Sequence, residues 1–167
     1  AFEFNGESFG AFNKALEGYA RETVQSLSYQ PIPTVAKGYY EVGTHKIVMN
    51  SRLTDSEKAK TLIHELAHAK MHGENSPYKD TTTREQEMQA EMTAYVVAKS
   101  FGLDPADESI HYVANWTGKF AEIEDVERNL AAIQKTAREM IQGIDTHYGL
   151  ELEKEAEKST IEKESGI

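Results

Sequence analysis

The stretch 61–70, TLIHELAHAK, carries two histidines and a glutamate at the spacing H-E-x-x-H. If this stretch is helical, His64 and His68 lie one turn apart on the same face, where both imidazoles can bind one zinc ion. Glu65 then lies beside them and can act as the general base toward a water molecule that the metal activates. The bare pattern also occurs in helices without a metal, so the function depends on whether the chain supplies a third ligand.

A third ligand is expected from the next helix. Catalytic zinc sites usually have three protein ligands and one open position, and cysteine is absent from this chain. The stretch 84–94, REQEMQAEMTA, places Glu87 and Glu91 one helical turn apart. We assign Glu87 as the third zinc ligand and Glu91 as the carboxylate that accepts the second ring N–H of a ligand histidine. Two imidazoles and one carboxylate also suit other divalent metals.

Three residues near the motif can be given more than one role. His72 follows His68 by one turn, but a fourth protein ligand would close the site, so we favour a structural or solvent-facing role for it. A donor for the oxyanion of the transition state can come from a neighbouring strand. Tyr39 and Tyr40 are candidates, and because strand side chains alternate between faces, at most one of them reaches the site.

The elements that position these residues follow from capping and turn signals. Thr54-Asp-Ser-Glu57 is a capping-box pattern, so we expect the motif helix to begin after Thr54 and to end near His72, before Gly73. The second helix should run from Thr82 or Thr83 to about Phe101. The remaining predicted elements are a helix over 8–27, a β-hairpin over 35–42 and 45–50, a short helix over 109–116 and a long helix over about 123–147.

These elements predict an α+β fold. It is mostly helical and zincin-like, with a small antiparallel sheet beside the motif helix. Residues 1–150 are expected to form a single metallopeptidase domain. Residues 151–167 have few apolar side chains and many charges, which indicates an exposed helix extension or a disordered tail.

Composition restricts the possible partners. The 167 residues are 39% hydrophobic and 28% charged and carry a formal net charge of −10, which disfavours direct binding of a nucleic-acid backbone. No apolar run approaches the roughly 18 residues of a membrane span, and we expect a cytoplasmic protein. The chain opens at AFEF without a methionine, which we interpret as an excised domain or a processed product. Nothing in the sequence indicates the oligomeric state.

Several segments together resemble the ImmA/IrrE-type metallopeptidase family. They are GYY at 38–40, HKIVMN at 45–50, TLIHELAHAKMH at 61–72 and EQEMQAEMTAYVVA at 85–98. The later segments 101–104, 109–116 and 130–140 resemble one branch more closely, the C-terminal peptidase domain of ArdC-like and LtrC-like proteins of plasmids and other mobile elements. The similarity covers roughly Phe9 to His147.

The resemblance implies the same five site residues: His64, His68 and Glu87 as zinc ligands, Glu65 as general base and Glu91 as the residue that orients a histidine. It also implies a protein or peptide substrate and an anti-restriction or mobile-element role for the full-length protein. DNA would be contacted only through an N-terminal domain that this chain does not contain. The alternative function is a zinc-stabilised module that binds a protein partner without cutting it.

Overall fold

The computed structural model describes residues 6–104 and 123–166. Helices predominate, and one small sheet accompanies them, so the predicted α+β class is confirmed. The short helix predicted over 109–116 lies outside the described residues. The described elements are α1 (Gly6–Thr23), β1 (Ser26–Gln30), β2 (Gly38–Glu41), β3 (Lys46–Asn50), α2 (Asp55–His72), α3 (Thr83–Ser100) and α5 (Ile123–Glu164).

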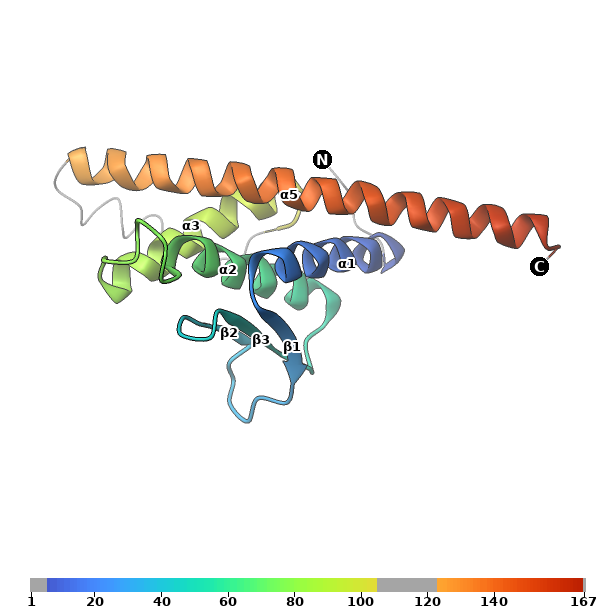
Figure 1. Cartoon of the computed structure of the whole chain (residues 1–167), viewed down its shortest axis with the longest axis horizontal. Coiled ribbons are helices and arrows are strands. Elements are labelled where there is room, and N and C mark those ends of the chain that lie inside the picture. Colours follow the sequence, from blue (N-terminus) through green and yellow to red (C-terminus); the bar gives the residue numbers. More distant parts are fainter. Residues whose placement is uncertain (1–5, 105–122, 167) are drawn as a thin grey trace.

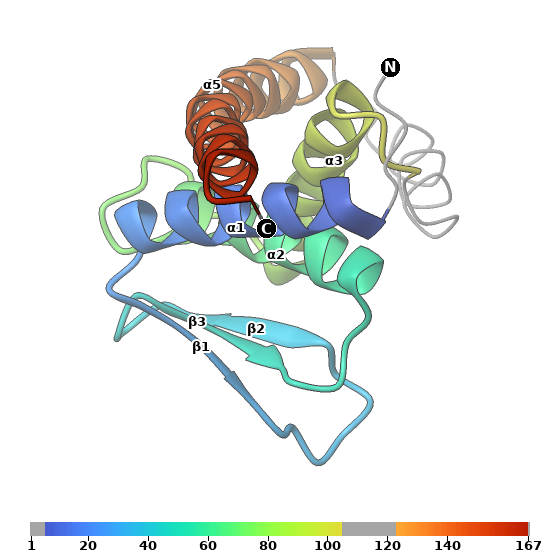
Figure 2. The same ribbon diagram turned by 90° about the vertical axis from the view of Figure 1, so that its right-hand side faces the viewer.

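Helix α2 is the centre of the fold. It contacts β2 and β3 on one side and α1, α3 and α5 on the others. Figures 1 and 2 show the sheet on one side of α1 and α2, with α5 running across the opposite side. The buried face of α2 explains this position, because Leu62, Ile63 and Leu66 are at most 2% exposed. Burial of such side chains is the main force that holds the layers together.

The sheet has the order β1-β3-β2, with β3 in the middle. β2 pairs with β3 in the predicted antiparallel manner, but β1 pairs with β3 in parallel, so the sheet is mixed. The central position of β3 explains its apolar sequence: Ile47 and Met49 are completely buried in the core shared with α2. β2 is also shorter than the predicted strand over 35–42.

The first helix ends earlier than predicted. α1 stops at Thr23, and Leu27, the last residue of the helix predicted over 8–27, belongs to β1 instead. β1 alternates exposed Ser26 and Ser28 with the half-buried Leu27 and Tyr29, whose side chains pack against the core. Pairing with β3 therefore overrides the helical pattern that continues through this stretch.

The start and end of α2 agree with the capping signals. The hydroxyl of Thr54 accepts a hydrogen bond from the backbone N–H of Glu57 at 3.2 Å, and the backbone N–H of Thr54 donates to the Glu57 carboxylate at 3.1 Å. This is the reciprocal capping box. The helix ends at His72, and Gly73 follows it. α3 begins in a similar way, because the hydroxyl of Thr82 accepts from the backbone N–H of Glu85.

Helix α5 packs closely on α1 and then extends past it. Two glycines permit the close approach: a Cβ atom at Gly143 would meet the ring of Tyr19, and one at Gly18 would meet the ring of His147. Beyond residue 150, α5 continues to Glu164, and its side chains there are mostly exposed. Figure 1 shows this end of α5 projecting beyond α1. Of the two structures predicted for the end of the chain, the helix extension is observed up to this residue. None of the helices in the described ranges combines the length and apolarity that a membrane span requires.

Candidate metal centre

The two histidines of the motif and the two glutamates of α3 face one another across a close helix pair. Ala67 of α2 and Ala90 of α3 are completely buried, and such small side chains allow helix backbones to approach. His64 and His68 follow one another by one turn on α2, as do Glu87 and Glu91 on α3. The helical spacing of both motifs therefore brings four polar side chains to the same side of the pair.

Three ligand atoms converge at one point. The Glu87 carboxylate lies 3.2 Å from Nε2 of His68 and 3.6 Å from Nε2 of His64. All three ligand atoms lie within 4.8 Å of one another. Atoms that bind one ion tetrahedrally at zinc-ligand distances stand roughly 3.3 Å apart, so this set fits a divalent metal. The Glu87 side chain is 50% exposed, which leaves the ligand set open toward solvent on that side.

The charges at this point also suit a cation. Hydrogen bonds from His64 and His68 lower the pKa of Glu87 far below its usual range. Burial by itself would lower the pKa of His64, but the carboxylates of Glu87 and Glu91 outweigh it and raise that pKa to about 10. An environment that favours an imidazolium so strongly favours a metal cation at the same position.

Glu91 contacts the other ring nitrogen of His64. Its Oε2 atom lies 2.9 Å from Nδ1 of His64. Nδ1 of His64 is buried and has no well-aligned hydrogen-bond acceptor, so the Glu91 oxygen does not lie along the direction of an N–H bond from this atom. We therefore regard the contact as mainly electrostatic. Glu91 thus lies beside the ring nitrogen of His64 that does not face Glu87, and its role as acceptor of the ring N–H stays a prediction.

Glu65 is buried next to the ligand set. It is 7% exposed, and burial raises the pKa of its carboxyl, although His64 and His68 and the backbone amide of Tyr40 act in the opposite direction. A carboxylate whose pKa is moved toward neutrality is better suited to exchange a proton with a reacting group. Glu65, His64 and Glu91 line one hollow of about 490 Å³, together with Val35 and Gly38.

The sequence pattern of the IrrE N-terminal-like domain, a peptidase family, matches residues 8–117. This match covers more than half of the chain and includes α1 from residue 8 onward, the sheet, α2 and α3 with all five site residues. The chain belongs to this family. An uncharacterized protein of Bacillus anthracis, pXO2-81, is 33% identical over 146 residues, which are 86% of this chain and 24% of the relative. The chain thus spans about a quarter of the length of that relative. No solved structure matches the chain significantly.

Within this IrrE-like domain, the strand β2 lies against the ligand helix at Gly38. A Cβ atom there would stand 3.1 Å from Cγ2 of Thr61 and 3.0 Å from the carbonyl oxygen of Val48. Only a residue without a side chain fits so close an approach without movement of its neighbours. Gly38 therefore lets the edge of the sheet form one wall of the hollow that contains His64 and Glu65.

The two tyrosines proposed as oxyanion donors, Tyr39 and Tyr40, have other surroundings than the ligand set. The hydroxyl of Tyr40 bonds to Nδ1 of His45 at 2.5 Å, and Nε2 of His45 bonds to the carbonyl oxygen of Thr23 at 2.8 Å. Tyr40 therefore connects β2 to the β2–β3 turn and to the end of α1. Tyr39 is 40% exposed, and the strand alternation places it on the other face of the sheet.

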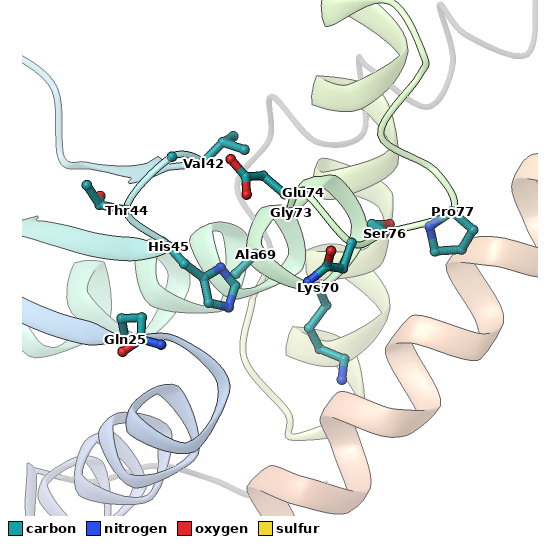
Figure 3. A pocket seen from close by; sticks show the side chains of 12 residues that line it. Gln25, Val42, Thr44, His45, Ala69, Lys70, Gly73, Glu74, Ser76 and Pro77 are labelled. Carbon is teal, nitrogen blue, oxygen red and sulfur yellow. The ribbon is translucent and has the colours of Figure 1, made fainter.

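A second hollow, of about 510 Å³, lies at the far end of α2 (Figure 3). It is lined by His45, Lys70, Gly73 and Glu74 among others. The ring nitrogens of His45 are engaged as described above, and the ammonium group of Lys70 pairs with Glu139 of α5 at 3.1 Å. The two basic side chains of this hollow are therefore engaged with other parts of the fold.

His72 is buried rather than solvent-facing. It is 4% exposed, and its Nδ1 lies 2.9 Å from Nδ1 of His68. Burial lowers the pKa of His72 to about 4, although its bond to Gln89 acts in the opposite direction. The sequence showed only that His72 and His68 share a helix face. The residues that bury His72 come from other helices, so no residue close to it in the sequence indicates that it is buried.

Proposed function

We propose that this domain is a zinc-dependent metallopeptidase. The observation that carries the proposal is the convergence of the Nε2 atoms of His64 and His68 and the Glu87 carboxylate beside the buried Glu65. These three ligands would hold the metal and leave one position open, as in other catalytic zinc sites. When bound, the metal would act as a Lewis acid on a water molecule and on the substrate carbonyl.

Glu65 would carry the proton through the reaction. Its carboxylate accepts a proton from the attacking water, and the resulting carboxylic acid returns that proton to the amine that leaves. Its burial and raised pKa support this role, because they favour the protonated form between the two transfers. The charge of Glu91, 2.9 Å from Nδ1 of His64, would favour the ring orientation in which Nε2 is directed at the ligand set.

The larger biological role is a separate proposal. The segments 101–104 and 130–140 support an ArdC-like or LtrC-like protein, and the relative of which this chain spans a quarter supports a larger parent protein. We propose that such a protein acts in the cytoplasm against host restriction on behalf of a mobile element. Cells that make it should accept unmethylated plasmid DNA more often than cells that make a Glu65→Gln version. Equal acceptance would argue against a peptidase-dependent anti-restriction role.

The peptidase proposal is tested by metal content and by cleavage, measured on the same four proteins. Wild type and Glu65→Gln should each carry about one zinc ion per chain, whereas His64→Ala and Glu87→Ala should carry little. A degenerate library of acetylated peptides should acquire new amino termini with zinc-loaded wild type and none with Glu65→Gln. A folded wild type that cannot be loaded with zinc would refute the metal centre.

Zinc binding without cleavage has a different meaning. If wild type and Glu65→Gln bind zinc equally and leave the peptide library uncut, the domain is better described as the zinc-stabilised binding module. Glu65→Gln is the suitable reference for both outcomes, because the amide keeps the size of the side chain and removes only its ability to take up a proton.

A further inference from the structure

A row of four polar side chains starts at the ligand His68 and leads away from the metal centre. Nδ1 of His68 lies 2.9 Å from Nδ1 of His72, and Nε2 of His72 lies 2.8 Å from Oε1 of Gln89. The Nε2 amide group of Gln89 donates to Oδ1 of Asn129 at 2.6 Å. The four residues come from α2, α3 and α5, so the row crosses all three helices.

The outer three residues of this row are almost completely buried. The exposed fractions are 4% for His72, 2% for Gln89 and 3% for Asn129. A buried polar group that loses its hydrogen-bond partner destabilises the fold, so the folded state favours the hydrogen bonds in the row. Helix packing therefore fixes their positions as firmly as those of the apolar core around them.

The orientation of the side-chain amides determines which atom donates and which accepts in each hydrogen bond of the row. Oδ1 of Asn129 only accepts, so the amide NH₂ of Gln89 faces it and Oε1 of Gln89 faces His72. That oxygen needs a donor, so His72 carries its proton on Nε2 and presents the lone pair of Nδ1 to His68. Only one proton fits between the two Nδ1 atoms, and it therefore belongs to His68.

This direction has a consequence at the other side of the His68 ring. A neutral imidazole has one N–H and one lone pair. With a proton held on Nδ1 toward His72, Nε2 is the atom of His68 that a metal would bind. In the structure this atom lies 3.2 Å from the Glu87 carboxylate and donates a hydrogen bond to it; a metal would take the place of that proton and meet the Nε2 lone pair. Histidine ligands of metals are commonly held by such a bond from the other ring nitrogen.

We infer that His72 is a positioning residue that, backed by Gln89 and Asn129, holds His68 in the tautomer and orientation needed to bind the metal. The inference rests on the proposed metal centre. It gives the two ligand histidines different supports, since His64 is held by the charged Glu91 and His68 by a row that carries no formal charge. It also gives α5, which lies outside the region of the family match, a part in the metal centre through Asn129.

The first test is zinc affinity, measured on the whole chain by competition with a chromophoric chelator. His72→Phe keeps the size of the ring and cannot accept from His68, so it should bind zinc about 10- to 100-fold more weakly. His72→Gln can accept through its oxygen and donate through its NH₂ group, so it should stay within about threefold of wild type. His147→Phe is the matched control: it removes a half-buried histidine paired with Glu22 and should leave zinc affinity unchanged.

The second test reads the tautomer directly and does not depend on zinc binding. Nitrogen-15 NMR of the imidazoles, with and without zinc, should show His72 protonated on Nε2 and bare on Nδ1. A proton on Nδ1 of His72 would overturn the inference, as would unchanged zinc affinity in His72→Phe. Should His72→Phe not fold, Gln89→Leu takes its place, with the same expected loss of affinity. A wild type that takes up no zinc would refute the proposed function, whereas the spectrum would still decide the state of His72.

Discussion

The contact between α1 and α5 leads to opposite effects for the same substitution at two glycines of one helix. Gly149 is exposed, and a Cβ atom there would meet nothing within 4 Å. Gly143 faces Tyr19, and a Cβ atom there would stand 2.6 Å from Cδ1 and 3.0 Å from Cζ of the ring, with Cε1 closer still. Gly149→Ala should therefore stabilise the domain, and Gly143→Ala should destabilise it.

The magnitudes follow from two terms. Replacing glycine by alanine inside an exposed helix lowers the free energy of the folded state by about 1 kcal/mol. At Gly143 the same gain is opposed by overpacking, which typically costs about 1–3 kcal/mol. We expect the upper end, because Tyr19 is only 7% exposed and is flanked by Lys70 and His147. The two variants should then differ by about 3 kcal/mol, or about 6–12 °C in Tm for a domain of this size.

Urea unfolding followed by circular dichroism measures this difference. A third variant tests the cause: in a Tyr19→Leu background, where the ring is gone, Gly143→Ala should lose most of its cost. A Gly143→Ala protein at least as stable as wild type would show that α5 does not lie on α1 at Tyr19. An equal cost in the Tyr19→Leu background would place the strain elsewhere.

Three further results are expected. Thr54→Ala removes the capping hydroxyl and should lower the free energy of unfolding by about 1 kcal/mol in urea titrations, whereas an unchanged midpoint would mean that α2 does not need this cap. Tyr40→Phe loses the hydrogen bond to His45 and should cost about 1 kcal/mol while zinc affinity stays the same; a large loss of affinity would instead link Tyr40 to the ligands. Burial lowers the pKa of His64, but Glu87 and Glu91 outweigh it and raise that pKa from 6.5 to about 10. In EDTA-treated protein, the pairing of the charged His64 with these carboxylates should therefore stabilise the fold in full below pH 6.5 and be lost as pH rises through about 10. The urea midpoint should fall over that interval in wild type and not in His64→Gln, and a flat wild-type profile would contradict the pairing.

The parts of the site that were predictable have local signals. The capping box at Thr54 and the glycine after His72 mark the ends of α2, and the spacing of His64 and His68 requires only that α2 be helical. The Glu87 position follows in the same way, since a loop and a second helix return the chain to the first. Except for the return of the chain to Glu87, these inferences depend on residues within one or two turns of one another, where helical geometry alone determines what shares a face.

The parts that were missed depend on distant segments. Leu27 fits the apolar face of a longer α1, and only the parallel pairing with β3 shows that it belongs to a strand. In the same way, nothing near His72 indicates burial, because Gln89 reaches it from α3 and is bonded in turn to Asn129 of α5. Sequence patterns describe neighbours along the chain, and these two features are made by neighbours in space.

The position of α5 also determines when the domain can become complete as the ribosome makes it. Ile133, Met140 and Ile144 are fully buried, so α1, α2 and α3 expose apolar surface until the chain has been synthesised past these residues. Asn129, the last member of the row behind His68, arrives at the same late stage. The nascent chain therefore contains the motif helix well before the metal centre can be completed. Contacts between residues so far apart in the sequence also form slowly. A fragment that stops at the end of the family match would remain in that unfinished state.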